Sequence, residues 1–152
     1  MSNSTYALLL SSLMLVACGG TEEPQPTRCE IETRDIDYVP GMVAAGNDGV
    51  FEIELIEAVP APPDKGDNAW SIELRDIASA APVSGAAVDV VPFMPDHGHG
   101  TSIIPVITEG AEPGHYQIDV INLWMPGFWE VRFDIDIDTG SDLVVFPICV
   151  EG

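Results

Sequence analysis

Along most of this chain, apolar residues alternate with polar ones at every second position. The clearest stretch is WEVRFDIDID at 129–138, where charged residues separate Trp129, Val131, Phe133, Ile135 and Ile137. Successive side chains of a strand point to opposite faces, so this pattern predicts a strand with one buried and one solvated face. The segments FEIEL at 51–55 and WSIEL at 70–74 predict two further strands of the same kind.

Other segments are rich in β-branched and aromatic residues and also predict strands. They are AVDVV at 87–91, TSIIPVI at 101–107, YQIDVINL at 116–123 and LVVFPICV at 143–150. Turn signals separate the strands: PPDKGDN at 62–68, EGAEPG at 109–114 and DTGSD at 138–142. About seven short strands without helical periodicity predict an all-β fold, an antiparallel immunoglobulin-like β-sandwich. A small closed barrel is the alternative.

The N-terminus has the pattern of an export signal. Residues 7–16, ALLLSSLMLV, form an apolar run that is too short to span a bilayer but matches the core of a signal peptide. The run leads into LVAC at 15–18, which resembles the lipobox of bacterial lipoproteins. The resemblance implies a signal peptide over 1–17, lipidation of Cys18 and attachment to a membrane through the lipid. Because MSNSTY, before the core, has no Lys or Arg, an ordinary secretory signal is the alternative. Gly19 stands where Asp would favour inner-membrane retention, so we expect the bacterial outer membrane, with the protein facing the periplasm.

The rest of the chain divides into a tether and one domain. Residues 18–28 are Gly, Pro and polar residues without apolar periodicity, which predicts a flexible segment. Residues 29–152 have the length of a single domain. Cys29 and Cys149 stand at its two ends, and in an exported chain such a pair predicts a disulfide. Thiolate metal ligands are the alternative, although neither cysteine has a CxxC neighbour.

The net charge of −20 limits the choice of partners. A surface of this sign repels nucleic acid and attracts cations, so we expect no DNA or RNA partner. Adaptation to a salty habitat explains the same charge without any ligand. The aspartates of DIDIDTGSD at 134–142 partly resemble a calcium loop, but isoleucines alternate with them and the loop's final Glu is missing. We therefore predict that these charges form the solvated face of a strand.

The candidate chemistry lies in FMPDHGHGT at 93–101, which contains two of the chain's three histidines. Residues two apart in extended backbone point to the same side, so His97 and His99 are predicted to face one point. Gly98 and Gly100 permit the positive φ that would bend both rings inward. Met94, three residues before His97, adds a thioether.

A second Met-Pro pair occurs in NLWMPGFW at 122–129, which we expect to be a hairpin between two core strands. If the fold brings the two connections together, Met125 joins Met94, His97 and His99 in a set that suits copper and is poor for Ca²⁺ or Mg²⁺. The alternative is structural: the rings satisfy backbone groups and the methionines fill the core. His115, in PGHY, is expected to be a turn residue beside a packing tyrosine.

Three blocks together resemble the YtkA-like domain family, which is related to FixH. They are GDNAW, GAAVDVVPFMPDHGHGT and PGHYQIDVINLWMPGFWEVRF, and the similarity covers residues 50–138. The shared elements are Met-x-x-His-Gly-His-Gly, Gly-x-Tyr and Met-x-Gly-x-Trp. The resemblance implies a small sandwich on the outside of a membrane and, from several relatives, a link to copper delivery or oxidase assembly. CEIETRD and FPICVEG, at the two ends, depart from the family pattern and look like additions closed by the predicted disulfide.

Two functions follow from this sequence. The first is a lipoprotein that binds copper through Met94, His97, His99 and Met125 and delivers it to a copper-accepting or other envelope protein. The second is a metal-free interaction module of the envelope, in which a sheet edge binds a protein. We do not expect an enzyme, because the sequence has no nucleophile elbow, phosphate loop or HExxH motif.

Overall fold

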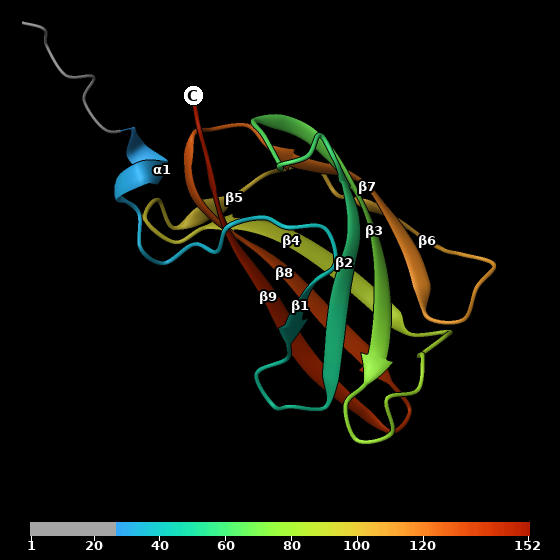
Figure 1. Cartoon of the computed structure of the whole chain (residues 1–152). Helices are drawn as coiled ribbons and strands as arrows, with labels where there is room; N and C mark the ends of the chain where they lie inside the picture. Colours follow the sequence, from blue (N-terminus) through green and yellow to red (C-terminus); the bar gives the residue numbers. More distant parts are fainter. Residues whose placement is uncertain (1–26) are drawn as a thin grey trace, which may run out of the picture.

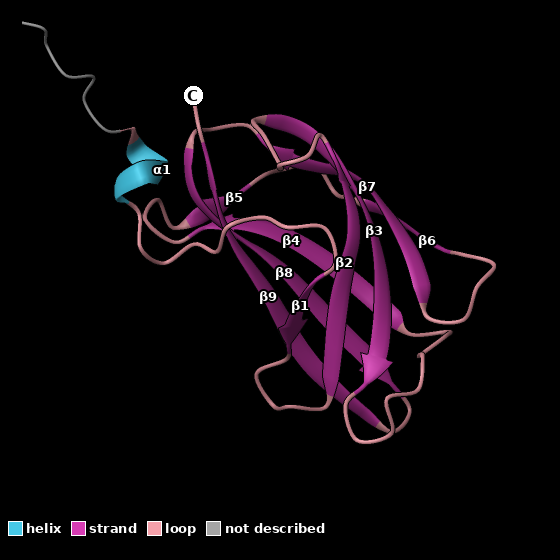
Figure 2. Ribbon diagram, viewed as in Figure 1, coloured by secondary structure: helices cyan, strands magenta, loops and turns pink. Residues whose placement is uncertain are grey.

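The computed structural model describes residues 27–152, so the predicted signal peptide, Cys18 and nearly all of the tether lie outside the described residues. Within that range the chain forms two antiparallel sheets (Figures 1 and 2). The five-stranded sheet has the order β1 (Met42–Ala45), β2 (Phe51–Val59), β3 (Gly66–Asp76), β7 (His115–Leu123), β6 (Val106–Glu109). The four-stranded sheet has the order β5 (His99–Gly100), β4 (Ala87–Met94), β8 (Gly127–Ile137), β9 (Gly140–Val150). The prediction of an all-β antiparallel sandwich is confirmed.

The core lies between the two sheets and is built by the alternation seen in the sequence. In β8 the side chains of Trp129, Val131, Phe133 and Ile135 are fully buried, while Asp134 and Asp136 are exposed. Aromatic side chains pack between the two sheets, with Trp70 of β3 against two phenylalanines of the other sheet. The ring centroids of Trp70 lie 6.1 Å from Phe133 and 5.7 Å from Phe146. Side chains of this size dominate core energetics, so these contacts hold the sheets together.

One predicted strand is wrong in most of its length. TSIIPVI was expected to be a strand over 101–107, but residues 101–105 belong to neither sheet and β6 begins at Val106. This segment leaves β5 in one sheet and enters β6 in the other, so it cannot follow a single hydrogen-bonded neighbour. Pro105 also lacks the N–H that a ladder requires. β1 is an addition to the predicted strands.

The chain before β1 lies along the end of the sandwich and is attached to it covalently. The predicted disulfide is present: Cys29 and Cys149 are bonded, with Cα atoms 5.4 Å apart. Cys29 lies in α1 (Arg28–Ile31), a single turn that begins with a capping box made by Thr27 and Glu30. Further along, the backbone N–H of Ile36 donates to the carbonyl of Pro147 in β9 at 3.0 Å. None of the helices in residues 27–152 has the length and apolar composition needed to cross a membrane.

Asp142 is a buried carboxylate at the opposite end of β9. It accepts the backbone N–H groups of Asp48, Val50, Phe51 and Leu143 at 2.8–3.2 Å. Gly46 allows this approach, because a Cβ built there would lie 2.1 Å from the carboxylate. The aspartates of β8 are exposed, as predicted, so Asp142 differs from them by fixing the turn that leads into β2.

Candidate functional site

The two histidines of interest lie on the tight connection between β4 and β5. Strand β4 ends at Met94, whose carbonyl accepts the backbone N–H groups of His97 at 3.2 Å and Gly98 at 2.9 Å. Gly98 has a φ of +66°, which turns the chain so that β5 returns beside β4 and His99 pairs with Met94. The rings are therefore brought together by a turn, in place of the extended backbone that we predicted.

The two glycines of this connection serve different purposes. Positive φ was expected at both Gly98 and Gly100, and the structure shows it only at Gly98. At Gly100 the requirement is space, because a Cβ would lie 2.4 Å from the carbonyl oxygen of Pro92. Larger residues are therefore disfavoured at both positions, for conformational reasons at one and for steric reasons at the other.

Three aromatic rings form one cluster at this end of the molecule, which we call the His–Trp cluster: His97, His99 and Trp124. The ring centroids of the two histidines are 5.5 Å apart, and His99 is stacked on Trp124 at 5.6 Å with an angle of 21° between the planes. Nδ1 of His99 lies 3.1 Å from the carbonyl oxygen of Gly100. A carbonyl only accepts, so in the neutral ring this nitrogen carries the proton and Nε2 has the lone pair that is available to a ligand.

The connection that carries Met125 reaches the same place. It was predicted to be a hairpin, but β7 and β8 belong to different sheets, so residues 124–126 cross from one sheet to the other. The reason is that β7 pairs with β3 and β6, whereas β8 pairs with β4 and β9. Met125 is half-buried against the core, and its carbonyl accepts the indole N–H of Trp129 at 2.9 Å.

The two methionines differ in accessibility. The side chain of Met94 is 1% exposed and belongs to the core, with its methyl group beside Gly127 at the start of β8. Met125 lies at the boundary of the core, next in the chain to Trp124. The structure therefore brings His97 and His99 together at the surface, places Met125 on the adjoining connection and puts Met94 beneath the turn. His115, the third histidine, is the first residue of β7, and its Nε2 lies 3.5 Å from a carboxylate oxygen of Glu112.

An arginine from the N-terminal segment holds the β4–β5 connection. Arg34 donates to both carboxylate oxygens of Asp96 at 2.7 and 2.8 Å and to both oxygens of Glu32 at 2.7 and 2.8 Å. Its guanidinium also lies 4.2 Å from the ring centroid of Phe128. These hydrogen bonds hold the pKa of Asp96 below its usual value and lower the pKa of Glu32 to about 2. Because Asp96 directly precedes His97, Arg34 fixes the base of the turn.

Sequence reasoning missed two members of this site, Arg34 and Trp124. Trp124 could have been found from the sequence, because it precedes Met125 in the WMPG block. No sequence pattern points to Arg34, because its contact with Asp96 joins positions 62 residues apart.

The donor atoms determine which metals this site suits. The part of the chain that the structure describes has no group of three or more His, Cys, Asp or Glu side chains arranged for a metal ion. The β4–β5 turn carries the two imidazoles of His97 and His99, and the adjoining connection carries the thioether of Met125. Imidazole and thioether suit copper, whereas Ca²⁺ and Mg²⁺ require several oxygen ligands. The donor types therefore fit copper.

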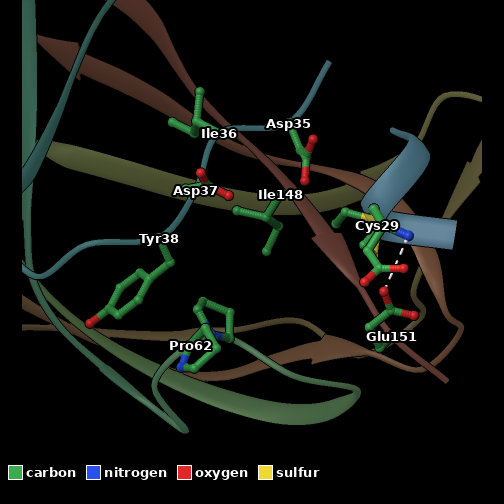
Figure 3. A pocket seen from close by; sticks show the side chains of 11 residues that line it. Cys29, Asp35, Ile36, Asp37, Tyr38, Pro62, Ile148 and Glu151 are labelled. Carbon is green, nitrogen blue, oxygen red and sulfur yellow. Dashed lines mark hydrogen bonds between the residues drawn. A yellow bond between two sulfur atoms is a disulfide. The ribbon is translucent and has the colours of Figure 1, made fainter. Parts of the chain in front are cut away.

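A separate hollow of about 290 Å³ lies beside the disulfide (Figure 3). The N-terminal segment forms one wall with Asp35, Asp37 and Tyr38, and Pro62 comes from the β2–β3 loop. The carboxylate of Glu151 accepts the backbone N–H of Cys29 at 3.2 Å across its rim. This hollow contains none of the four predicted ligands, so it is not the predicted site.

A comparison with family models identifies one match, described as YtkA-like, over residues 44–134. The matched region runs from β1 into β8 and includes both the β4–β5 turn and the connection that carries Met125. It leaves out the N-terminal segment, all of β9 and both cysteines of the disulfide. Searches of curated proteins and of solved structures found no match.

Proposed function

We propose that this chain, which belongs to the YtkA-like family, binds a copper ion at its β4–β5 turn and passes it to an acceptor protein in the cell envelope. The observation that carries the proposal is the pairing of His97 and His99, whose rings lie 5.5 Å apart on a turn fixed at both ends. The hydrogen bond from Nδ1 of His99 to the carbonyl of Gly100 supports it, since Nε2 is then free to bind an ion.

The proposed ligands differ in how readily they reach an ion. His97 is exposed and His99 is half-exposed, so both imidazoles are available from solvent. Met125 supplies a thioether from the adjoining connection, and Met94 supplies one from the core side of the turn. A thioether favours Cu(I) over harder ions, which would make the site selective for the reduced metal. Copper is cargo in this proposal, and no reaction is assigned to the protein.

Copper titration tests the proposal. The wild-type protein is expected to bind copper stoichiometrically, and the His97→Ala/His99→Ala variant is expected to lose that binding and keep its fold, because the exposed turn contributes little to the core. His115→Ala is the matched control, since it removes the third histidine at a site away from the turn. Affinity is also expected to fall on acidification, because a protonated imidazole is no longer a ligand. Met125→Leu, which keeps an apolar side chain, should weaken Cu(I) more than Cu(II).

The proposal is overturned if the wild type takes up no stoichiometric copper, or if the double variant binds copper as the wild type does. A double variant that melts at a lower temperature with no difference in metal uptake points to a structural role for the histidines. Thermal melting with and without copper, for the wild type and the three variants, separates these outcomes.

We further propose that Cys18, which lies outside the described residues, is lipidated and holds the protein at the periplasmic face of the bacterial outer membrane. The support is the LVAC sequence that follows the apolar run. Cys18→Ser is expected to yield protein without lipid mass that is released from membranes, because several acyl chains hold firmly where a single chain does not. Cys29→Ser is the control and should stay anchored. Wild-type protein that washes off in carbonate and carries no lipid mass would contradict this location.

A further inference from the structure

Large apolar side chains remain exposed beside the His–Trp cluster. Within residues 27–152, five of the eleven exposed large apolar residues belong to this one region, which we call the apolar patch: Val91, Ile103, Ile104, Val106 and Trp124. Ile104 is 79% exposed and Trp124 is 49% exposed. Single exposed apolar residues are ordinary, but a group of them is typical of an interaction site.

The patch is continuous over the surface. One shallow hollow is lined by His99, Ile103 and Trp124, and a neighbouring hollow is lined by Val91, Ile103 and Ile104. Ile103 is common to both hollows, so the surface runs without a break from Trp124 to Val91. Val106, which is also exposed, follows two residues after Ile104 at the start of β6.

The topology explains why these side chains lack cover. Residues 101–105 connect β5, the edge strand of the four-stranded sheet, to β6, the edge strand of the five-stranded sheet. β6 is the last strand of the five-stranded sheet, so one row of its backbone N–H and C=O groups has no neighbouring strand among the described residues (Figure 1). β4 pairs with β5 only at Phe93 and Met94, which leaves the rest of that edge unpaired in the same part of the chain. Open edges of this kind accept an added strand.

The patch is also neutral within a strongly acidic protein. Residues 97–108 and 121–129 contain no Asp, Glu, Lys or Arg, although the whole chain has 25 acidic and 5 basic residues. Carboxylates surround this neutral region. Asp89 lines the hollow beside Val91, Asp119 pairs across the strands with Val106, and Asp67 accepts a hydrogen bond from Asn122. Within the described residues none of these three aspartates forms an ion pair. Arg132, which lies opposite Val91 on β8, is bound by Glu130, and Arg34 and Arg75 are each bound by carboxylates elsewhere.

We propose that the apolar patch is a docking surface for an extended segment of another protein, with apolar residues at its centre and Lys or Arg on its flanks. The apolar centre matches the exposed side chains, the cationic flanks match the three aspartates, and an extended backbone matches the open edge of β6. A second copy of this chain is disfavoured because each copy has a net charge of −20, and a membrane surface with anionic headgroups is repelled for the same reason. The inference does not depend on copper, although a partner docked here would lie against His99.

Trp124 provides the readout. The other two tryptophans, Trp70 and Trp129, are fully buried, so a ligand that covers the patch changes the emission of Trp124 alone. A library of random 12-residue peptides is selected against the full-length protein in the presence of a chelator, and the selected peptides are then titrated. We expect them to combine apolar residues with an excess of Lys or Arg and to shift the Trp124 emission to shorter wavelength.

Matched substitutions locate the binding. Ile104→Asp adds a charge at the centre of the patch and is expected to weaken the selected peptides by at least about tenfold. Val43→Asp is the control, because Val43 is another exposed apolar residue, on β1 at the other edge of the five-stranded sheet. Both sites are exposed, so both variants should melt close to the wild type.

Several results would overturn the inference. They are a selection that yields no peptide, selected peptides without excess positive charge, and peptides that bind Ile104→Asp as well as the wild type. A concentration-dependent dimer that Ile104→Asp abolishes would identify the occupant as a second copy. An emission shift with phosphatidylcholine vesicles equal to that with the peptides would identify it as a lipid surface. Because the selection is done without metal, failure of copper binding leaves this result unchanged, and failure of peptide binding leaves the copper titration unchanged.

Discussion

Replacing either Cys29 or Cys149 with alanine is expected to lower the free energy of unfolding by about 2–5 kcal/mol. The two cysteines are 120 residues apart, so their bond restricts nearly the whole unfolded domain. Neither side chain belongs to the core, so truncation leaves no large cavity and the loss comes mainly from a freer unfolded chain. The measurement is urea unfolding of the wild type and of each single variant.

The double variant is the internal control for this prediction. One bond is lost in all three proteins, so Cys29→Ala/Cys149→Ala should be destabilised about as much as either single variant. Reduced wild-type protein should match them as well. Reduced and oxidised wild type that unfold at the same urea concentration would show that the bond does not stabilise the fold.

Asp142→Asn is expected to destabilise the fold by about 2–4 kcal/mol, because it replaces a charged acceptor of four backbone N–H groups with a neutral amide that has one oxygen. Asp142 is 4% exposed, so solvent cannot replace the lost hydrogen bonds. Asp136→Asn is the matched control. It makes the same chemical change at an exposed position and should alter the unfolding free energy by no more than about 0.5 kcal/mol.

The effect of Asp142 should depend on pH in a defined direction. Burial raises the pKa of this carboxyl, but the four N–H groups outweigh burial and hold the pKa below the ordinary value of 3.8. A lowered folded-state pKa means that the stabilisation is complete above the unfolded-state pKa and is lost as the pH falls through the folded-state pKa. The difference in stability between wild type and Asp142→Asn should therefore be constant near neutral pH and shrink below about pH 4. A difference that stays constant down to pH 2 would contradict this account.

The strands of the core could be predicted because each has a pattern that is complete within a few residues. In β8, fully buried side chains alternate with exposed aspartates, so a period of two appears directly in the sequence. The same local reasoning failed at TSIIPVI. Its β-branched residues have the composition of a strand, but whether they pair depends on which sheet the chain is leaving and which it is entering. That information is not local.

The candidate site divides in the same way. His97, Gly98 and His99 were recognisable as a motif because four residues of turn bring them together. Arg34 could not be recognised as part of the site, because its hydrogen bonds to Asp96 form only when the N-terminal segment lies along the end of the sandwich. The connection carrying Met125 was misjudged as a hairpin because adjacent strands in the sequence were assumed to be adjacent in one sheet. β7 and β8 belong to different sheets because each pairs with other strands, and those pairings join segments that are distant in the sequence.

The bond between Cys29 and Cys149 also has a consequence for how the chain behaves when it is cut. With the bond formed, the backbone between these residues is a closed ring that contains nearly all of both sheets. A protease that hydrolyses one peptide bond in an exposed turn, such as the Asp138–Thr139 turn between β8 and β9, opens the ring without producing two separate molecules. The fragments remain covalently joined, and the hydrogen-bonded strands on either side of the cut remain paired. Reduction is needed before the pieces can separate, so in an oxidising compartment the nicked protein stays a single covalent molecule, heavier than the intact one only by the water added on hydrolysis.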